Sequence, residues 1–346
     1  MPSFDVDRRP AYVLGKDMLS SRLKIQRSSL LINKLNVRQQ RIWLVETPSE
    51  NAICSSEFMP FVSEMVNLEF LREFFLSNET TKKLEELSTG TSNSQNRVSP
   101  KDIINFKLAI PTLPEQEAIG TFLSTLDRHI TLHQRKLDKL KSVKQAYLSE
   151  MFPAEGERVP KRRFPRFTDA WELRKLGELG TFKNGMNFSK DAMGTGFPFI
   201  NLQNIFGKNV VDISQLGLAM ASSIQLKNYN LQKGDVLFVR SSVKLEGVGE
   251  TAIVPKNLED TTYSGFIIRY RDSFGMDINF KRYTFGTNNI RNQIMSQATD
   301  SANKNISQQV LAELDILVPS LPEQEAIGNF FSTLDQHITL HQRKSI

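Results

Sequence analysis

The chain has 346 residues, of which 39% are hydrophobic, and this is enough material for two compact domains with separate cores. Its formal net charge of +6 favours a polyanionic partner without identifying one. The single cysteine, Cys54, excludes an intramolecular disulfide and a zinc site built from several cysteines. No apolar run reaches the roughly 18 residues of a membrane span, and the first twelve residues lack the features of a signal peptide. We therefore expect a cytoplasmic protein.

Residues 1–109 form the first predicted domain. Its clearest strand signal is the segment LLINK, which ends at Lys34 and is followed by a polar loop. Residues 92–110 are predicted to form a polar loop, a short helix and a strand that leads into the next element.

A long helix is predicted for residues 110–152. Pro114 is tolerated in a first helical turn, and the glutamates beside it place negative charge at the positive end of the helix dipole. Apolar residues then recur every three or four positions, which is typical of a coiled-coil seam. A helix of this length would extend about 55 Å, and a single seam of this kind requires a partner helix.

A basic, proline-rich linker follows at residues 153–170. Its prolines exclude a helix and predict a stiff, extended spacer. Its arginines and lysine either contact phosphate or are simply solvated, and the sequence leaves both alternatives open.

Residues 171–317 form the second predicted domain. Short strand-like runs such as FPFINL, GDVLFVR, TAIVP and GFIIRY are separated by glycine and asparagine turns. A helix is expected at Ile278–Ala298. The pattern favours one α/β domain of about 150 residues.

Residues 318–346 repeat the start of the first long helix almost letter for letter. The segment Ile110–Lys136 returns as Val318–Lys344, and the copies differ little even at charged positions. The separation of about 200 residues is a domain plus a helix, which is too long for a solenoid repeat of roughly 20–50 residues. We expect the two helices to pack as an antiparallel coiled coil, with the second helix shorter by about four turns. The predicted packing residues are Ile119, Phe122, Leu126, Ile130, Leu137, Leu140, Phe330, Leu334 and Ile338.

The two domains align with each other over part of their length. The segment from Ser92 aligns with that from Asp300, and the segment from Leu23 aligns with that from Tyr229. No counterpart of WELRKLGELG, which begins at Trp171, is found in the first domain. We therefore expect an incomplete first domain, and a chain truncated at both ends relative to a symmetric arrangement.

The chain resembles the specificity subunit of a type I restriction-modification system. The resemblance is carried by the doubled LPEQEAIG, STLD and HITLHQRK helix starts, by WELRKLGELG, and by the FPFINLQN and GDVLFVRSS strands. It implies an α+β protein in which two α/β target-recognition domains, the first of them incomplete here, are joined by long helices forming an antiparallel coiled coil. It also implies a non-catalytic subunit that reads a bipartite double-stranded DNA target for a restriction and DNA modification complex. Methyltransferase and restriction subunits would be its partners.

The motifs that are missing from the sequence agree with a subunit that recognises DNA without modifying it. There is no methyltransferase motif with Pro-Pro and an aromatic residue, no P-loop and no evident carboxylate cluster for a nuclease metal. We predict no catalytic residue, no cofactor and no metal ion. All four histidines lie in i, i+4 pairs within the repeats, a spacing that suits one metal, but seam packing or partner contact is the favoured interpretation. They are His129, His133, His337 and His341.

Base reading in the major groove requires Arg, Lys, Asn or Gln side chains presented from loops or strand ends. The candidate DNA-binding residues of the second domain are Asn201, Gln203, Asn204, Lys208, Asn209, Arg240, Ser241, Ser242, Lys244 and Lys304. Those of the first domain are Lys34, Arg38, Gln39 and Arg41. The end of the GDVLFVR strand at Arg240 is the preferred position, and an ordinary exposed loop is the alternative.

Three further functional hypotheses remain open. The least favoured is an unrecognised enzyme, because no catalytic constellation is found in the sequence. A half-subunit could self-associate so that two chains read an inverted repeat, since a two-fold protein matches a palindromic site. Alternatively, the chain is the product of a silent cassette, or a decoy that binds methyltransferase subunits without reading DNA.

Overall fold

The computed structural model describes residues 11, 12, 14, 21–90, 95–298 and 304–344. The chain divides into two compact units, residues 1–132 (unit 1) and residues 133–346 (unit 2). The predicted polar loops that begin at Ser92 and Asp300 fall partly outside the described residues, as do the last two residues of the predicted second helix.

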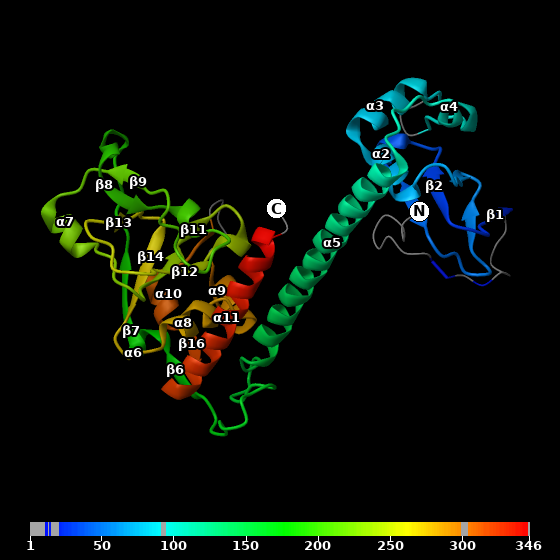
Figure 1. The fold of residues 1–346 in the computed structure, drawn as a ribbon. Coiled ribbons are helices and arrows are strands. Elements are labelled where there is room, and N and C mark those ends of the chain that lie inside the picture. The colour runs from blue at the N-terminus through cyan, green and yellow to red at the C-terminus, as the bar shows by residue number, and fades with distance from the viewer. Residues whose placement is uncertain (1–10, 13, 15–20, 91–94, 299–303, 345–346) are drawn as a thin grey trace. The chain divides into compact units, whose positions relative to one another are not determined.

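Unit 1 contains short strands, short helices and the first part of the long helix α5 (Figure 1). Its elements are β1 (Arg22–Lys24), β2 (Ser29–Asn33), the 3₁₀ turn η2 (Val37–Gln39), β3 (Ile42–Val45), β4 (Ile53–Ser55), β5 (Phe58–Phe61), α2 (Leu68–Leu76), α3 (Asn78–Leu87), α4 (Pro100–Ile104) and α5 (Leu113–Glu150), which continues into unit 2.

Unit 2 is a larger mixture of strands and helices, which confirms the predicted α+β class. Its first half contains β6 (Glu172–Lys175), α6 (Leu176–Leu179), β7 (Gly180–Asn184), η3 (Lys190–Ala192), β8 (Met193–Ile200), η4 (Leu202–Asn204), β9 (Gly217–Ala219) and α7 (Ser223–Asn228). Its second half contains β10 (Val236–Val239), β11 (Ser241–Ser242), η5 (Leu245–Gly247), β12 (Thr251–Ile253), β13 (Thr262–Tyr263), β14 (Ile267–Asp272), α8 (Ile278–Thr284), α9 (Asn288–Gln297), β15 (Lys304–Asn305), α10 (Gln308–Ala312), β16 (Asp315–Val318) and α11 (Leu321–Lys344).

The central strands β2 and β10 are buried on both faces. The sheet orders are β3-β2-β5 in unit 1 and β12-β10-β14-β7 in unit 2, and all of these pairs are antiparallel. In β10, Val236 and Leu237 belong to different apolar clusters, and in β2 Leu30 and Leu31 also do. Successive side chains of a strand point to opposite faces, so both sheets have a core on each side. This explains the continuous apolar runs LLI and VLFV in the sequence.

The single helix predicted for Ile278–Ala298 is wrong. The structure has α8 and α9 instead, and the chain between them turns at Phe285–Thr287. The N–H of Gly286 donates to Tyr283 O at 3.1 Å, and Thr287 precedes α9 in extended conformation at the N-cap position. Glycine lowers helix propensity, and the Thr287 hydroxyl donates to Thr284 O at 2.7 Å rather than capping α9. The turn at these residues therefore separates the two helices.

The repeated glycine of each long helix is required by close packing on a shorter helix. A Cβ atom on Gly120 would lie 2.8 Å from the backbone nitrogen of Phe70 in α2. A Cβ atom on Gly328 would lie 2.7 Å from the backbone nitrogen of Phe280 in α8. Only glycine allows this approach. The pairs α2–α5 and α8–α11 are therefore two copies of one packing arrangement, and Figure 1 shows α11 running beside α8.

The carboxy-terminal part of α5 packs antiparallel on α11 within unit 2. Leu137 shares an apolar cluster with Leu334 and Ile338, whereas the Tyr147 ring lies 5.3 Å from the Phe330 ring. Residue numbers rise along α5 as they fall along α11, so the predicted antiparallel pairing is confirmed for this part of the helix.

The proline-rich segment after α5 is not the extended spacer that we predicted. Phe152 and Trp171, on either side of it, lie in one apolar cluster with their rings 5.9 Å apart. Within the segment, the Arg163 guanidinium donates to both carboxylate oxygens of Glu323 in α11, at 2.6 and 2.7 Å. Buried aromatic contacts and a buried ion pair thus hold the segment against unit 2. None of the described helices is long and apolar enough to span a bilayer.

Candidate nucleic-acid interface

Lys34 and Arg240 occupy equivalent positions, each one residue beyond a central strand. In both cases the backbone N–H donates to the residue just before the neighbouring strand, β5 or β14, and the carbonyl accepts from the segment on the other side. The sequence alignment predicted this equivalence, and both strand ends carry a cation. The four bonds are Lys34 N–H to Glu57 O (2.9 Å), Val98 N–H to Lys34 O (3.0 Å), Arg240 N–H to Phe266 O (2.7 Å) and Ile306 N–H to Arg240 O (3.0 Å).

The loop after each central strand returns through a residue with positive φ. This residue is Gln40 in unit 1 (φ 46°) and Gly249 in unit 2 (φ 67°). The next residue, Arg41 or Glu250, accepts a hydrogen bond at its carbonyl from the last residue of the central strand, at 3.1 and 2.8 Å respectively. The two loops therefore have the same backbone arrangement, but the charges of Arg41 and Glu250 at the equivalent position are opposite.

Three of the predicted DNA-binding residues lie side by side in unit 2. Strand β11 pairs with β15, with Ser242 opposite Lys304 and Ser241 opposite Asn305. In unit 1 the corresponding bridge joins Leu35 to Arg97. The segment before α10 thus reaches the end of the central strand, as the predicted Lys304 contact requires.

A pocket of about 570 Å³ opens beside β11. Ser241, Ser242 and Lys244 supply hydroxyl and ammonium groups to its wall, and Val243 and Phe266 supply exposed apolar surface. Hydroxyl and ammonium groups can contact base edges, while apolar groups can contact the methyl group of thymine. The pocket thus gathers three of the predicted DNA-binding residues, and the carboxylates of Glu246 and Glu250 lie in the same wall.

Asn204, one of the predicted base readers, is only 3% exposed. Its Nδ2 donates to Asp212 O and Gln215 O at 2.8 and 3.0 Å, and its Oδ1 accepts from the Asn201 N–H at 3.0 Å. Asn201 in turn caps η4 by accepting from the Leu202 N–H at 2.8 Å. These two side-chain amides stabilise the loop. Because the Asn204 side chain is buried and hydrogen-bonded within the loop, we do not retain it as a candidate base reader.

The other members of this loop have mixed surroundings. Gln203 is exposed. The Lys208 ammonium lies 2.6 Å from Asp212 Oδ2, and hydrogen bonding from Lys208 lowers the pKa of the Asp212 carboxyl. Asn209 Nδ2 lies 3.3 Å from Asp335 Oδ2, so this side chain is directed to α11.

In unit 1, the predicted residues surround η2. Lys34 and Arg41 are half-buried, and Gln39 is exposed. Arg38 forms an ion pair with Glu85 of α3, and Gln40 Nε2 donates to both α2 and α3 residues at 2.9 Å. The loop after β2 is thus fixed against the two helices that follow it in the chain.

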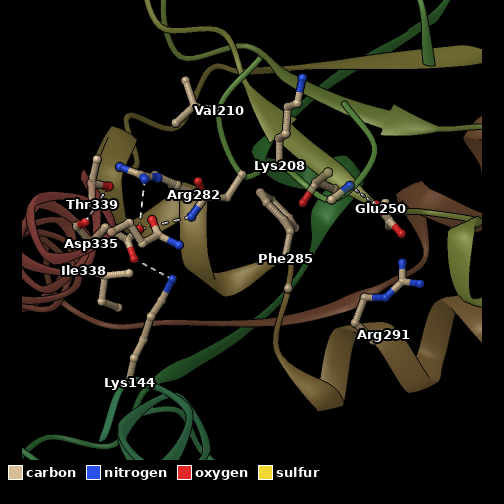
Figure 2. A pocket seen from close by; sticks show the side chains of 15 residues that line it. Lys144, Lys208, Val210, Glu250, Arg282, Phe285, Arg291, Asp335, Ile338 and Thr339 are labelled. Atoms are coloured by element: carbon tan, nitrogen blue, oxygen red, sulfur yellow. Dashed lines mark hydrogen bonds and ion pairs between the residues drawn. The ribbon is translucent and has the colours of Figure 1, made fainter. Parts of the chain in front are cut away.

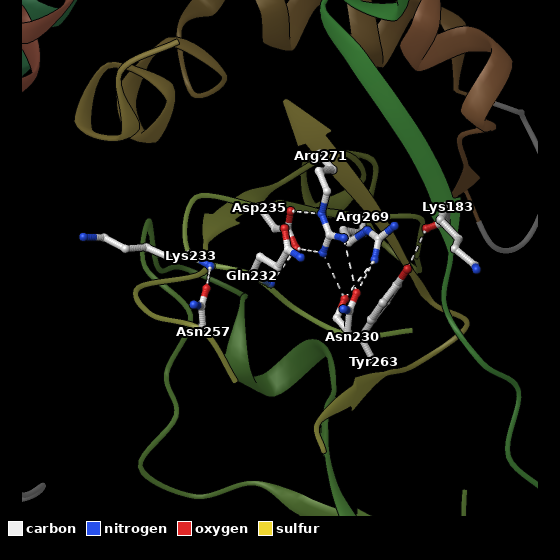
Figure 3. Close-up of polar contacts among 9 residues, drawn as sticks. All are labelled: Lys183, Asn230, Gln232, Lys233, Asp235, Asn257, Tyr263, Arg269 and Arg271. Atoms are coloured by element: carbon white, nitrogen blue, oxygen red, sulfur yellow. Dashed lines mark hydrogen bonds and ion pairs between the residues drawn. The ribbon is translucent and has the colours of Figure 1, made fainter. Parts of the chain in front are cut away.

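A pair of arginines on β14, the buried Arg269 and the half-buried Arg271, was not anticipated (Figure 3). Arg271 donates to both carboxylate oxygens of Asp235, at 2.8 and 2.6 Å, and Arg269 Nη1 donates to Asn230 O at 2.8 Å. Burial raises the pKa of the neighbouring Tyr263 hydroxyl, which keeps it neutral. The two arginines of the sequence RYR are two residues apart, so they lie on the same face of the strand. This spacing is the sequence feature that could have predicted the pair. The network fixes the turn before β10.

A second group that sequence reasoning missed surrounds Asp335 in a pocket of about 810 Å³ (Figure 2). Asp335 Oδ2 accepts from Arg282 Nη2 and Tyr283 Oη, both at 2.9 Å, and its Oδ1 lies 2.6 Å from Lys144 Nζ. One carboxylate of α11 thus connects α8, α5 and, through Asn209, the loop that follows η4. The sequence feature that could have predicted this group is the repeat, in which Asp127 is the first-copy counterpart of Asp335. Asp127 also pairs with an arginine, Arg72.

The predicted coiled-coil residues differ in how far they are buried. Leu137, Leu334 and Ile338 form a buried cluster with the partly buried Leu140 and Phe330. Ile119 is half-buried. Phe122, Leu126 and Ile130 are exposed in the described part of the chain, and Phe122 is 68% exposed.

Two of the four histidines meet across the helix seam. The Nδ1 atoms of His133 and His341 lie 3.3 Å apart, so one ring donates and the other accepts. His337 is exposed. In the part of the chain that the structure describes, no group of three or more His, Cys, Asp or Glu side chains is placed to hold a metal ion.

Comparison with known proteins gives one consistent result. A family model described as the type I restriction modification DNA specificity domain matches residues 45–142 and 168–346. The EcoKI type I restriction enzyme specificity subunit of Escherichia coli K12 is 26% identical over 266 residues, covering 75% of this chain and 56% of that protein. The MjaVIII specificity subunit of Methanocaldococcus jannaschii is 22% identical over 291 residues, covering 79% and 63%. The chain therefore spans less than two thirds of the length of these curated relatives.

The fold agrees with that of a solved relative. The crystal structure of a type I restriction-modification system S subunit from M. genitalium superposes with a TM-score of 0.54, at 15% identity, over 93% of this chain and 80% of that chain. The first match begins at the last residue of β3 and includes the start of α5, and the second includes β6 to α11. Since the two matches together cover most of the sequence, the chain belongs to the type I restriction modification DNA specificity domain family.

Proposed function

We propose that this protein is a DNA sequence-specificity subunit that acts in the cytoplasm and has no catalytic activity of its own. The observation that carries the proposal is the equivalence of Lys34 and Arg240. A cation at the same place in both units, beside loops rich in polar side chains, suits contact with DNA phosphates and guanine edges. The opposite charges of Arg41 and Glu250 in the shared backbone arrangement of the loops favour two different half-sites, and hence a bipartite target.

The same proposal assigns the methyltransferase and restriction subunits to the exposed faces of the long helices. The carboxy-terminal part of α5 and α11 are held together by the seam at Leu137, so their outer faces remain available as a rigid scaffold. Recognition and scaffolding would then be carried by different surfaces of one chain.

Pairing of two chains is a second candidate arrangement, and one observation favours it. Phe122, Leu126 and Ile130 are the first-copy counterparts of the α11 residues that pack against Leu137, yet they are exposed in the described chain. An exposed apolar stripe on a helix is typical of an interaction site. Pairing of two chains through this stripe would place two recognition units in a two-fold arrangement.

The test is binding of the purified chain to a random-sequence duplex, measured by fluorescence anisotropy across a range of salt concentrations. We expect affinity to fall with salt, and Lys34→Ala or Arg240→Ala to lower the slope of log K against log salt by about 1 for each phosphate that is no longer neutralised. Lys256→Ala is the control, because this exposed lysine follows the far end of β12. Absence of duplex binding would favour the decoy that binds methyltransferase subunits without reading DNA.

A further inference from the structure

Lys107–Ile110 in unit 1 is the sequence counterpart of β16, but no strand lies beside it in the part of the unit that the structure describes. In unit 2, β16 pairs antiparallel with β6 through four residues. No strand among the described residues pairs with Lys107–Ile110. Ile110 is 50% exposed, whereas its counterpart Val318 is only 5% exposed. The difference marks an edge that is covered in one unit and open in the other.

Unit 2 shows which segment covers this edge. After β6, the α6 residues Leu176 and Leu179 are fully buried in the core, and the Leu176 N–H donates to Leu314 O at 2.9 Å. Gly177 lies against α10, where a Cβ atom on it would be 2.9 Å from the Ala312 side chain. The counterpart of Ala312 in unit 1 is Ile104, which is 68% exposed. The apolar surface that a β6–α6 segment covers is thus uncovered in unit 1.

The charge at this edge is reversed between the two units. In unit 2, Lys175 of β6 lies 2.8 Å from the carboxylate of Asp315 in β16. Lys107 stands in unit 1 at the position of Asp315. A segment suited to unit 1 therefore has an acidic residue where β6 has Lys175, since like charges on facing strands repel.

The neighbouring sheet edge limits how far such a segment can extend. Strand β7 continues from α6 and pairs with β14, where Arg269 faces Lys183. The counterpart of β14 in unit 1 is β5, and Pro60 stands at the place of Arg269. Proline has no N–H to donate to an added strand and is typical of an edge. The bound segment would end at the turn that corresponds to α6.

We propose that unit 1 binds an extended segment of another polypeptide along Lys107–Ile110. The segment has the pattern of β6 and α6: a short strand with an acidic residue at the position of Lys175, followed by Leu, Gly, any residue and Leu. Backbone pairing supplies affinity, and the two leucines and the acidic residue supply selectivity, as in other cases of strand addition. This surface is separate from the proposed DNA-binding loops, so either proposal can fail alone.

The test is a titration of the full chain into fluorescently labelled peptides with the sequence of residues 170–180, followed by anisotropy. We expect the Lys175→Glu peptide to bind roughly three- to tenfold more tightly than the natural sequence at low salt, with the difference shrinking as salt rises. A peptide that also carries Gly177→Leu should bind more weakly, because Ile104 leaves less room than Ala312.

The matched chain variants are Ile110→Asp, within the proposed edge, and Ile53→Asp, on an exposed isoleucine of β4 in the same unit. Ile110→Asp should abolish saturable binding, and Ile53→Asp should retain it. Binding that is equal for both variants would overturn the proposal. Failure of every peptide to bind would also overturn the proposal. It would mean that the partly buried rings of Phe74 and Phe106 already cover the apolar surface beside Lys107–Ile110.

Discussion

Gln116 and Gln324 make the same pair of hydrogen bonds in the two units, and both side chains are buried. Each Oε1 accepts from the N-cap backbone N–H of the shorter helix, and each Nε2 donates to the carbonyl of a proline just before the long helix. The glutamine and glycine of the repeated PEQEAIG sequence therefore serve the docking of the long helix on its own unit. The bonds are Asn67 N–H to Gln116 (2.9 Å), Gln116 to Pro111 O (2.9 Å), Asp277 N–H to Gln324 (3.0 Å) and Gln324 to Pro319 O (2.9 Å).

Replacing Gln324 by alanine should destabilise unit 2 by about 2–4 kcal/mol, because two buried backbone groups lose their hydrogen-bond partners. The free energy of unfolding measured in urea checks this value. Gln342→Ala, at an exposed position of the same helix, should change stability by less than about 0.5 kcal/mol. Equal effects of the two substitutions would contradict the assigned role.

Asp335→Asn should weaken the packing of α11 more than Asp127→Asn weakens the packing of α5. Asp335 pairs with Lys144 and Arg282 and accepts from Tyr283, whereas the ion pair of Asp127 is with Arg72. We expect a loss of about 2–3 kcal/mol for Asp335→Asn, because two partly buried cations lose their counter-charge. Urea unfolding of both variants measures the difference, and a larger effect at Asp127 would argue against the connecting role of Asp335.

The Glu73 carboxyl makes the stability of unit 1 dependent on pH. Burial raises its pKa more than the nearby Arg72 charge lowers it. The folded state therefore holds this proton more tightly than the unfolded chain does. The stabilisation is complete below the ordinary glutamate pKa and is lost as pH rises through the folded value.

Glu73→Gln should accordingly stabilise unit 1 at pH 7 and lose this advantage at acidic pH, below the ordinary glutamate pKa of about 4.3. Urea unfolding at the two pH values is the measurement. Glu86→Gln, an exposed change on α3, serves as the control and should have little effect at either pH. A destabilised Glu73→Gln variant at pH 7 would show that the ion pair with Arg72 outweighs burial.

Cys54 offers a direct probe of unit 1, since it is the single cysteine and is buried within β4. Burial raises the pKa of its thiol, which lowers the reactive thiolate fraction. We expect a thiol reagent at pH 8 to modify the folded protein at least about 100-fold more slowly than the denatured chain, because the reaction requires opening of the unit. Equal rates would mean that β4 is not stably paired with β1.

The fold could be predicted from sequence where one periodic signal dominated. The runs LLIN and VLFV became β2 and β10 because their residues are buried on both faces, and the repeated helix starts became α5 and α11. The break between α8 and α9 was missed because a single glycine such as Gly286 lowers helix propensity without always ending a helix. The packed path of the segment after α5 depends on long-range contacts such as Arg163 with Glu323, which no local pattern encodes.

The equivalent positions of Lys34 and Arg240 were predictable from the sequence, whereas the surroundings of the loop residues were not, and the role of these residues in DNA binding stays a prediction. Arg240 and Lys34 follow directly from the strand pattern. Asn204 was misjudged because an asparagine that caps and braces a loop has the same local sequence signal as one that is free to reach a base. The Asp335 group depends on residues far apart in the chain, and only the repeat hinted at it.

The most direct test of DNA specificity is a genome-wide methylation map of cells that express this chain with its neighbouring methyltransferase subunit, compared with cells that carry the methyltransferase alone. We predict a new bipartite motif in the presence of the chain, with one half lost in the Arg240→Ala variant and the other in Lys34→Ala. A palindromic split motif would instead indicate two paired chains in which one unit reads DNA. A map that is identical with and without the chain would contradict the proposal that it confers DNA specificity.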